Sequence, residues 1–270
     1  MAIGGIEIIS PLLLAYPGSS WRDDVEALWN FLHQEYIISG DSNCSTHVHV
    51  SRAEGFTLPE LKRISQAVIH FEAAFEVLVP QERRGNEYSR SNWLDNPYFA
   101  LKNLSRDKSI DFLDGLTTTE EVLDAMNPNQ SKYFGWNFLS IKLYKTIEFR
   151  RGPVSLSAND TFLWVELTIS FVQAALTPRS PAQLRQYPRT IGGLRTFIQH
   201  AQLSKNPGMH EESHLNRLFE DISWSANLEP TPVGDLSREK NEKLQKKIKA
   251  DSTSNPVLEI ISSAHEHGAV

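Results

Sequence analysis

The chain contains a single cysteine, Cys44, which excludes an internal disulfide and is typical of a reducing compartment. It has no apolar run long enough to cross a membrane, and its N-terminus lacks the basic segment and long apolar core of a secretory signal. A net charge of −6 gives no electrostatic reason to bind nucleic acid or an anionic membrane. We therefore expect a soluble, cytoplasmic protein that binds neither nucleic acid nor membrane.

What is present is the composition of an ordinary globular protein, with 40% hydrophobic and 22% charged residues over 270 positions. That length can bury one large core and still leave a tail. The pattern changes after Pro178, where helical segments replace the mixture of strands and helices, and again at Glu229, before a lysine-rich segment. We predict an α+β domain at 1–177, a helical extension packed on it at 178–228, and a charged, partly disordered tail at 229–270, with Ser237–Asp251 as a solvated helix.

Two short segments combine an apolar face with an ionisable one. In Ser45–Ser51, β-branched residues alternate with His47 and His49, so a strand here presents both imidazoles on one face. In Thr146–Arg150, the same alternation places Glu148 and Arg150 on one face of a strand. We expect Lys132–Phe138 to be a strand that neighbours it.

The N-terminal segment Ile3–Pro11 reads as a short strand, in which Glu7 is set among isoleucines. A carboxylate in such a strand is costly to bury unless it is paired or binds a cation, although an edge-strand Glu facing water explains it equally well. Farther along, Thr57 and Glu60 form a capping box that begins a long helix ending at Pro80. Apolar residues recur on one stripe of that helix, and Glu72 and Glu76 fall off the stripe, so we expect both carboxylates in solvent.

These strands together suggest a cation site, because carboxylate oxygen and imidazole nitrogen are common metal ligands. Magnesium binds through few protein carboxylates when phosphate completes its shell, whereas zinc also accepts His-x-His, so the spacing leaves both metals open. A cross-strand salt bridge explains Glu148 and Arg150 without any metal. Cys44, with no paired base in the sequence, is interpreted as a strand residue rather than a nucleophile.

Three motifs occur in an order that resembles the amidoligase family, whose members are carboxylate–amine ligases related to the glutamine synthetase fold. The motifs are Gly5–Pro11, Cys44–Val50 and Thr146–Arg150, and the resemblance covers roughly positions 4 to 175. Arg83–Tyr88 is similar to the arginine/asparagine segment that follows the central helix in fungal members. The ordered triplet is much more specific than any one of its motifs.

The resemblance implies a curved antiparallel sheet with helices on its outer face and the site on its concave face, followed here by the helical C-terminal region. It also implies ATP and Mg²⁺, with Mn²⁺ as an alternative, and amide formation between a small-molecule or peptide carboxylate and an amine. Carried over by motif, the resemblance assigns Glu7, His47 and Glu148 as cation ligands. It assigns Arg150 as a contact of nucleotide or acyl phosphate, and His49 with Arg150 as catalytic residues on the same face. Arg83 and Arg84 are further phosphate or carboxylate contacts.

The family pattern includes one more strand, with a pair of acidic residues, ahead of the segment at which this sequence begins. Met1 stands six residues before Glu7, so we expect a site short of those carboxylates. This departure motivates an alternative, a non-catalytic relative that binds a ligand or a partner. A third, weaker hypothesis is a zinc-dependent hydrolase that uses His47 and His49.

Overall fold

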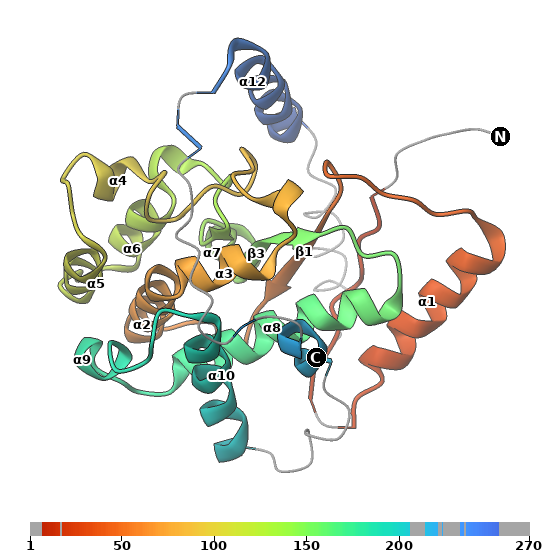
Figure 1. The fold of residues 1–270 in the computed structure, drawn as a ribbon, viewed down its shortest axis with the longest axis horizontal. Helices are drawn as coiled ribbons and strands as arrows, with labels where there is room; N and C mark the ends of the chain where they lie inside the picture. The colour runs from red at the N-terminus through yellow and green to blue at the C-terminus, as the bar shows by residue number, and fades with distance from the viewer. Residues whose placement is uncertain are drawn as a thin grey trace.

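A computed structural model describes residues 7–16, 18–205, 214–220, 223, 233–234 and 236–253 (Figure 1). The fold is α+β, as predicted, with helices around a small antiparallel sheet. The sheet has three strands in the order β1 (Ser45–Val50), β3 (Ile147–Pro153), β2 (Trp136–Asn137). The described helices are α1 (Trp21–Glu35), α2 (Leu58–His70), α3 (Glu72–Leu78), α4 (Pro97–Ala100), α5 (Arg106–Asp114), α6 (Thr119–Met126), α7 (Ser140–Tyr144), α8 (Ala158–Leu176), α9 (Pro181–Leu184), α10 (Ile191–Lys205), α11 (Leu215–Glu220) and α12 (Arg238–Thr253), with 3-10 turns η1 (Gln81–Arg83) and η2 (Pro128–Gln130).

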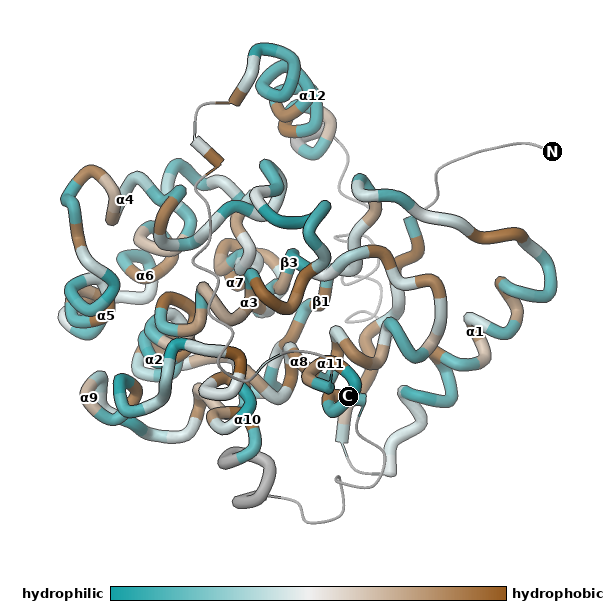
Figure 2. Tube along the Cα trace, in the orientation of Figure 1, coloured by the Kyte–Doolittle hydropathy of each residue, from teal (hydrophilic) through white to brown (hydrophobic). Residues whose placement is uncertain are grey.

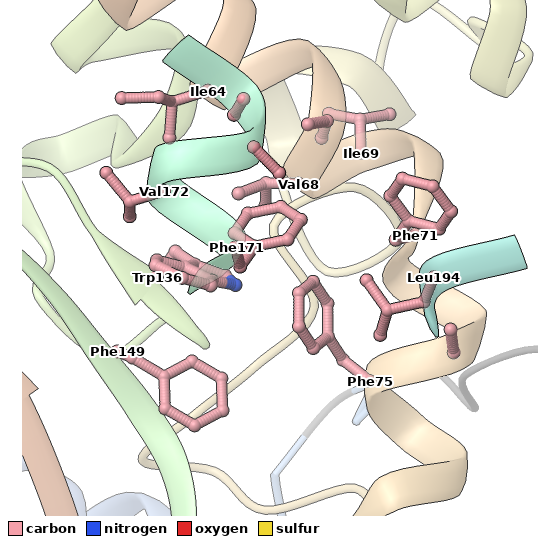
Figure 3. Close-up of a cluster of buried hydrophobic side chains, with 14 of the residues drawn as sticks. Ile64, Val68, Ile69, Phe71, Phe75, Trp136, Phe149, Phe171, Val172 and Leu194 are labelled. Atoms are coloured by element: carbon pink, nitrogen blue, oxygen red, sulfur yellow. The ribbon is translucent and has the colours of Figure 1, made fainter. Parts of the chain in front are cut away.

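The core lies against one face of the sheet. Phe149 of β3 and Trp136 of β2 point from this face toward aromatic side chains of the covering helices (Figure 3). The ring of Phe171 in α8 lies 5.0 Å from that of Trp136 and 5.0 Å from that of Phe75 in α3. Strand alternation thus directs one set of side chains into an aromatic core and leaves the opposite face of the sheet for polar groups.

The long helix predicted up to Pro80 is divided into two. The capping box forms as expected, with the backbone N–H of Thr57 donating to Glu60 Oε2 at 2.8 Å. The helix then breaks at Phe71, whose φ of −98° and ψ of 15° are not helical, and α3 follows directly. Apolar residues recur on both sides of the break, so their spacing gave no sign of it.

The expectation that Glu72 and Glu76 are solvated is wrong. Both side chains are buried, and both accept hydrogen bonds from the buried guanidinium of Arg151 in β3, with Nη1 lying 2.5 Å from Glu76 Oε2. Gly135 packs against this guanidinium so closely that a Cβ there would clash with Arg151 Nε. A buried ion cluster therefore joins α3 to the helix-covered face of the sheet, because one guanidinium bonds both carboxylates within the core.

The N-terminal strand predicted over Ile3–Pro11 is not observed where the structure describes it. Residues 7–11 are irregular and largely exposed, and residues 3–6 lie outside the described ranges. A run of isoleucines has high β-propensity, but a strand also needs a partner edge to bond with. The second predicted strand is shorter than expected as well, since β2 spans only Trp136–Asn137 and α7 lies between it and β3.

The C-terminal part contributes to the same core. Leu194, Phe197 and Ile198 of α10 are buried in the hydrophobic cluster that contains the sheet residues. The lysine-rich segment forms α12, as predicted, and Figure 2 shows it as mostly hydrophilic. It is not wholly solvated, however, because Leu244 is buried and Asp251 contacts Tyr133. The division of the chain into three domains stays a prediction.

No helix in the described ranges is both long enough and apolar enough to cross a membrane.

Candidate functional site

The polar face of the sheet brings together four of the predicted site residues. Register places His49 of β1 directly opposite Glu148 of β3, in an antiparallel pair. His47 and Arg150 lie two positions away along their own strands and therefore share this face, although the register shifts between Thr46 and Val48. The grouping of the two histidines with Glu148 and Arg150 is what period-two alternation in both strands predicts.

Glu148 forms the buried floor of this group, with 4% of its surface exposed. Its Oε1 accepts a hydrogen bond from Arg150 Nη1 at 2.5 Å, and its Oε2 accepts from Asn137 Nδ2 at 2.7 Å and from Ser140 Oγ at 3.4 Å. Burial is the largest single effect and raises the pKa of this carboxyl. Arg150, the two histidines and the Asn137 amide together outweigh burial and lower the pKa to about 2. Glu148 is therefore an ionised carboxylate at neutral pH.

The two imidazoles stand above this floor at the rim of the site. His47 Nδ1 lies 3.4 Å and His49 Nε2 lies 3.6 Å from the same Glu148 Oε1. These separations are longer than an ordinary hydrogen bond. Their other ring nitrogens are held by hydroxyls, His47 Nε2 by Ser45 Oγ and His49 Nδ1 by Thr146 Oγ1, each at 2.9 Å.

Both imidazoles are uncharged near pH 7. The His47 side chain is 32% exposed, but loss of water around the rest of the ring, followed by the nearby Arg150, lowers the pKa of His47 to about 3. Burial is also the main cause that lowers the pKa of His49, and it outweighs the opposing effect of Glu148. A neutral imidazole has one unprotonated nitrogen, which can accept a proton or bind a cation. The rim of the site thus offers uncharged nitrogen ligands above an ionised carboxylate.

The two arginines of the Arg83–Tyr88 segment have different surroundings. Arg83 is buried, donates from Nη1 to the Ser42 carbonyl at 2.8 Å, and interacts electrostatically with Arg150 and His47. Burial, then Arg150, lowers the pKa of Arg83. Within the described part of the chain, Nε of Arg83 and Nε of Arg150 are buried donors without a hydrogen-bond acceptor. An anionic ligand would supply such an acceptor.

Arg84 is turned toward helix α3 instead. Its Nε donates to the carbonyls of Glu76 and Val79 at 3.0 and 3.2 Å, and its Nη2 donates to that of Val77 at 3.3 Å. These carbonyls belong to the end of α3 or follow it, where helix carbonyls lack intrahelical partners. The structure thus brings Arg83 to the site, whereas the guanidinium of Arg84 holds the end of a helix.

Glu7, the remaining predicted ligand, lies in the exposed irregular segment before Pro11. Across the residues that the structure describes, no group of three or more His, Cys, Asp or Glu side chains forms a preformed metal centre. Glu7, His47 and Glu148 therefore do not constitute one, and their role as cation ligands stays a prediction. A hollow of about 350 Å³ lies elsewhere, between the loop around Asp95 and Gly234, and none of the predicted site residues lines it.

Four contributors to this region were not identified from the sequence. Asn137 pairs with Glu148 across β2 and β3, and Ser140 follows at the start of α7. Tyr133 lies with its ring centroid 5.8 Å from the Arg150 guanidinium carbon, and Lys132 contributes to the lowered pKa of His49. The alternation in Lys132–Phe138 could have placed Asn137 beside Glu148, had the register of the two strands been known.

Comparison with known proteins identifies the family. The family model described as "putative amidoligase enzyme" matches residues 2–172, which include all three strands and most of α8. No curated protein and no solved structure matches the chain. Because the family match extends over more than half of its 270 residues, the chain belongs to this amidoligase family.

Proposed function

We propose that this amidoligase-family protein is an ATP-dependent carboxylate–amine ligase, which forms an amide bond through an acyl phosphate on a sheet of glutamine synthetase type. The observation that carries the proposal is the ionised, buried Glu148 beside Arg150, on the sheet face that also presents two uncharged imidazoles. The family match supports the ligase class of reaction and includes both strands that build this face.

The reaction has two steps. A carboxylate oxygen of the substrate attacks the γ-phosphorus of ATP, and ADP leaves. The amine nitrogen then attacks the acyl carbon, and inorganic phosphate leaves while the amine loses a proton. Arg150 and Arg83, each with a buried Nε that lacks an acceptor, would stabilise negative charge on the transferred phosphoryl group. His49, oriented by Thr146 Oγ1, would accept the proton from the amine.

The chemistry of the donors is compatible with a divalent cation bound jointly by protein and phosphate. Magnesium usually retains water and phosphate oxygens and takes few protein ligands. The carboxylate of Glu148 and the uncharged ring of His47 would be those ligands, with Glu7 as the predicted third. When bound, the cation offsets charge on the phosphates of ATP. The donors also admit Mn²⁺, which accepts both oxygen and imidazole ligands.

The proposal is tested by release of ADP and phosphate from Mg-ATP with panels of carboxylates and amines, alongside thermal unfolding with and without Mg-ATP. We expect ADP release that requires both a carboxylate and an amine, and at least a 100-fold loss of that rate in Glu148→Gln. Glu26→Gln, an exposed residue of α1, is the matched control and should retain full activity. Absence of turnover together with no stabilisation by Mg-ATP would contradict the proposal.

One observation favours a second function, that of a non-catalytic relative which binds a ligand or partner. Arg150 already bonds Glu148 Oε1 at 2.5 Å, so the carboxylate has its charge partner without a cation. On this hypothesis, Glu148→Gln and His47→Ala leave the biological output intact, whereas exchanges in the Arg83–Tyr88 segment abolish it. Loss of that output in the two sheet variants would exclude it.

A further inference from the structure

Helix α12 places one carboxylate beside the site described above. Asp251, near the C-terminal end of the helix, accepts hydrogen bonds at Oδ2 from Tyr133 Oη at 2.7 Å and from Lys132 Nζ at 2.8 Å. Its Oδ1 lies 3.5 Å from Lys247 Nζ of the same helix. Two donors of different chemistry, both from the segment before β2, thus converge on a single carboxylate oxygen.

These donors adjoin the polar face of the sheet. The Arg150 guanidinium carbon is 5.8 Å from the centroid of the Tyr133 ring, and Lys132 is among the charges that lower the pKa of His49. The neighbourhood therefore contains three cations, those of Lys132, Arg150 and Arg83, and one buried carboxylate, that of Glu148. Asp251 reduces the excess of positive charge among these groups but does not remove it, and such an excess favours binding of an anion.

Asp251 is poorly placed to stabilise its own helix. The C-terminal end of a helix carries partial negative charge, so a carboxylate in the last turn is unfavourable there. The ion pair with Lys247 at 3.5 Å offsets part of this cost, and the shorter contacts with Lys132 and Tyr133 account for the position of the carboxylate.

We propose that Lys132 Nζ and Tyr133 Oη form a carboxylate subsite of this protein, and that Asp251 occupies it as an internal competitor of the substrate carboxylate. The role as a substrate subsite rests on the ligase function proposed above. The ligand class is a carboxylate, because a lysine ammonium and a phenol hydroxyl 2.7 to 2.8 Å from one oxygen already bind that group here.

Few of the described side chains of α12 are buried, so its displacement is feasible. Among its described side chains, Leu244 is the buried one, and most of the others are exposed. An ion pair in which Lys240 Nζ lies 3.5 Å from Glu87 Oε2 is a further anchor. Elements with so few buried contacts open at low free-energy cost. A ligand carboxylate could therefore replace Asp251.

The test is calorimetric titration of the full-length protein with glutarate in the absence of nucleotide. Asp251→Ala removes the competitor, and alanine is compatible with a helix. We expect this variant to lower the apparent dissociation constant for glutarate about tenfold, which is the change for a subsite that is free of Asp251 in one-tenth of the wild-type molecules. The matched control is Glu242→Ala, which removes an exposed α12 carboxylate paired within the helix to Arg238, and it should bind as the wild type does.

Two further variants separate the subsite from a merely structural contact. Leu244→Ala loosens α12 without altering a charge and should tighten glutarate binding in the same direction. The double variant Lys132→Gln/Asp251→Ala should lose the gain. Equal binding by the wild type and Asp251→Ala, or a gain that persists in the double variant, would overturn the proposal.

The titration is independent of catalysis. Tighter binding by Asp251→Ala supports the subsite even if no ADP is released with any substrate, in which case only the ligase proposal fails. ADP release by the wild type without a gain in Asp251→Ala would overturn the subsite alone.

Discussion

Replacement of Arg151 by methionine tests the buried ion cluster beneath the sheet. The guanidinium is 6% exposed, and its partners Glu72 and Glu76 are 1% and 4% exposed. Methionine fills much of the same volume but leaves two buried carboxylates without the guanidinium that bonds both of them. Removing one member of a buried ion pair costs about 3–5 kcal/mol, and we expect a loss of that size in the free energy of unfolding.

The measurement is urea unfolding of both the variant and a surface control. Arg52→Met removes an ion pair with Glu60 in which the arginine is 39% exposed, and it should cost about 0–1 kcal/mol. Replacing the whole cluster, as Arg151→Met/Glu72→Leu/Glu76→Leu, should be less destabilising than Arg151→Met alone, because no unpaired charge remains. The reasoning is refuted if Arg151→Met costs no more than Arg52→Met, or if the triple variant is the least stable.

Two further predictions concern the same core. The Nε2–H of His70 donates to the Tyr187 carbonyl at 2.9 Å, and burial lowers the pKa of His70 from 6.5 to about 4. Between pH 6.5 and 4 the unfolded chain therefore binds more protons than the folded protein. The free energy of unfolding should fall over this range as pH drops, by up to about 3 kcal/mol from this group. In denaturant titrations, His70→Gln should flatten that pH dependence. Gly135→Ala should lower the melting temperature by several degrees, since its Cβ would displace the Arg151 side chain; an unchanged melting temperature would contradict the packing described at this position.

The site was largely predictable because its four central residues obey a local rule. His47 with His49, and Glu148 with Arg150, follow the two-residue period of a strand, so each pair shares a face whatever the rest of the chain does. The sequence could not give the register between strands, and register decides that Asn137 lies beside Glu148. It also could not relate α12 to the segment before β2, a contact between residues far apart in the chain.

The errors have the same origin. Glu72 and Glu76 lie off the apolar stripe of their helix, and a one-dimensional pattern assigns such residues to solvent. Their burial depends on Arg151, which lies 75 and more positions away along the chain and supplies the counter-charge. For Ile3–Pro11, β-propensity predicted a strand, but over 7–11 the chain is irregular because propensity supplies no partner edge. Tertiary partners, rather than local preferences, decided both cases.

The central claim is that the polar face of the sheet transfers phosphate to a carboxylate before the amide forms. The most direct measurement uses a carboxylate substrate that supports ADP release, labelled with oxygen-18 in its carboxyl group, followed by mass spectrometry of the inorganic phosphate. When the amine displaces phosphate from an acyl phosphate, one oxygen of the original carboxylate leaves with the phosphate. The account therefore predicts inorganic phosphate that carries one labelled oxygen. Phosphate without label, released at the same rate as ADP, would contradict it.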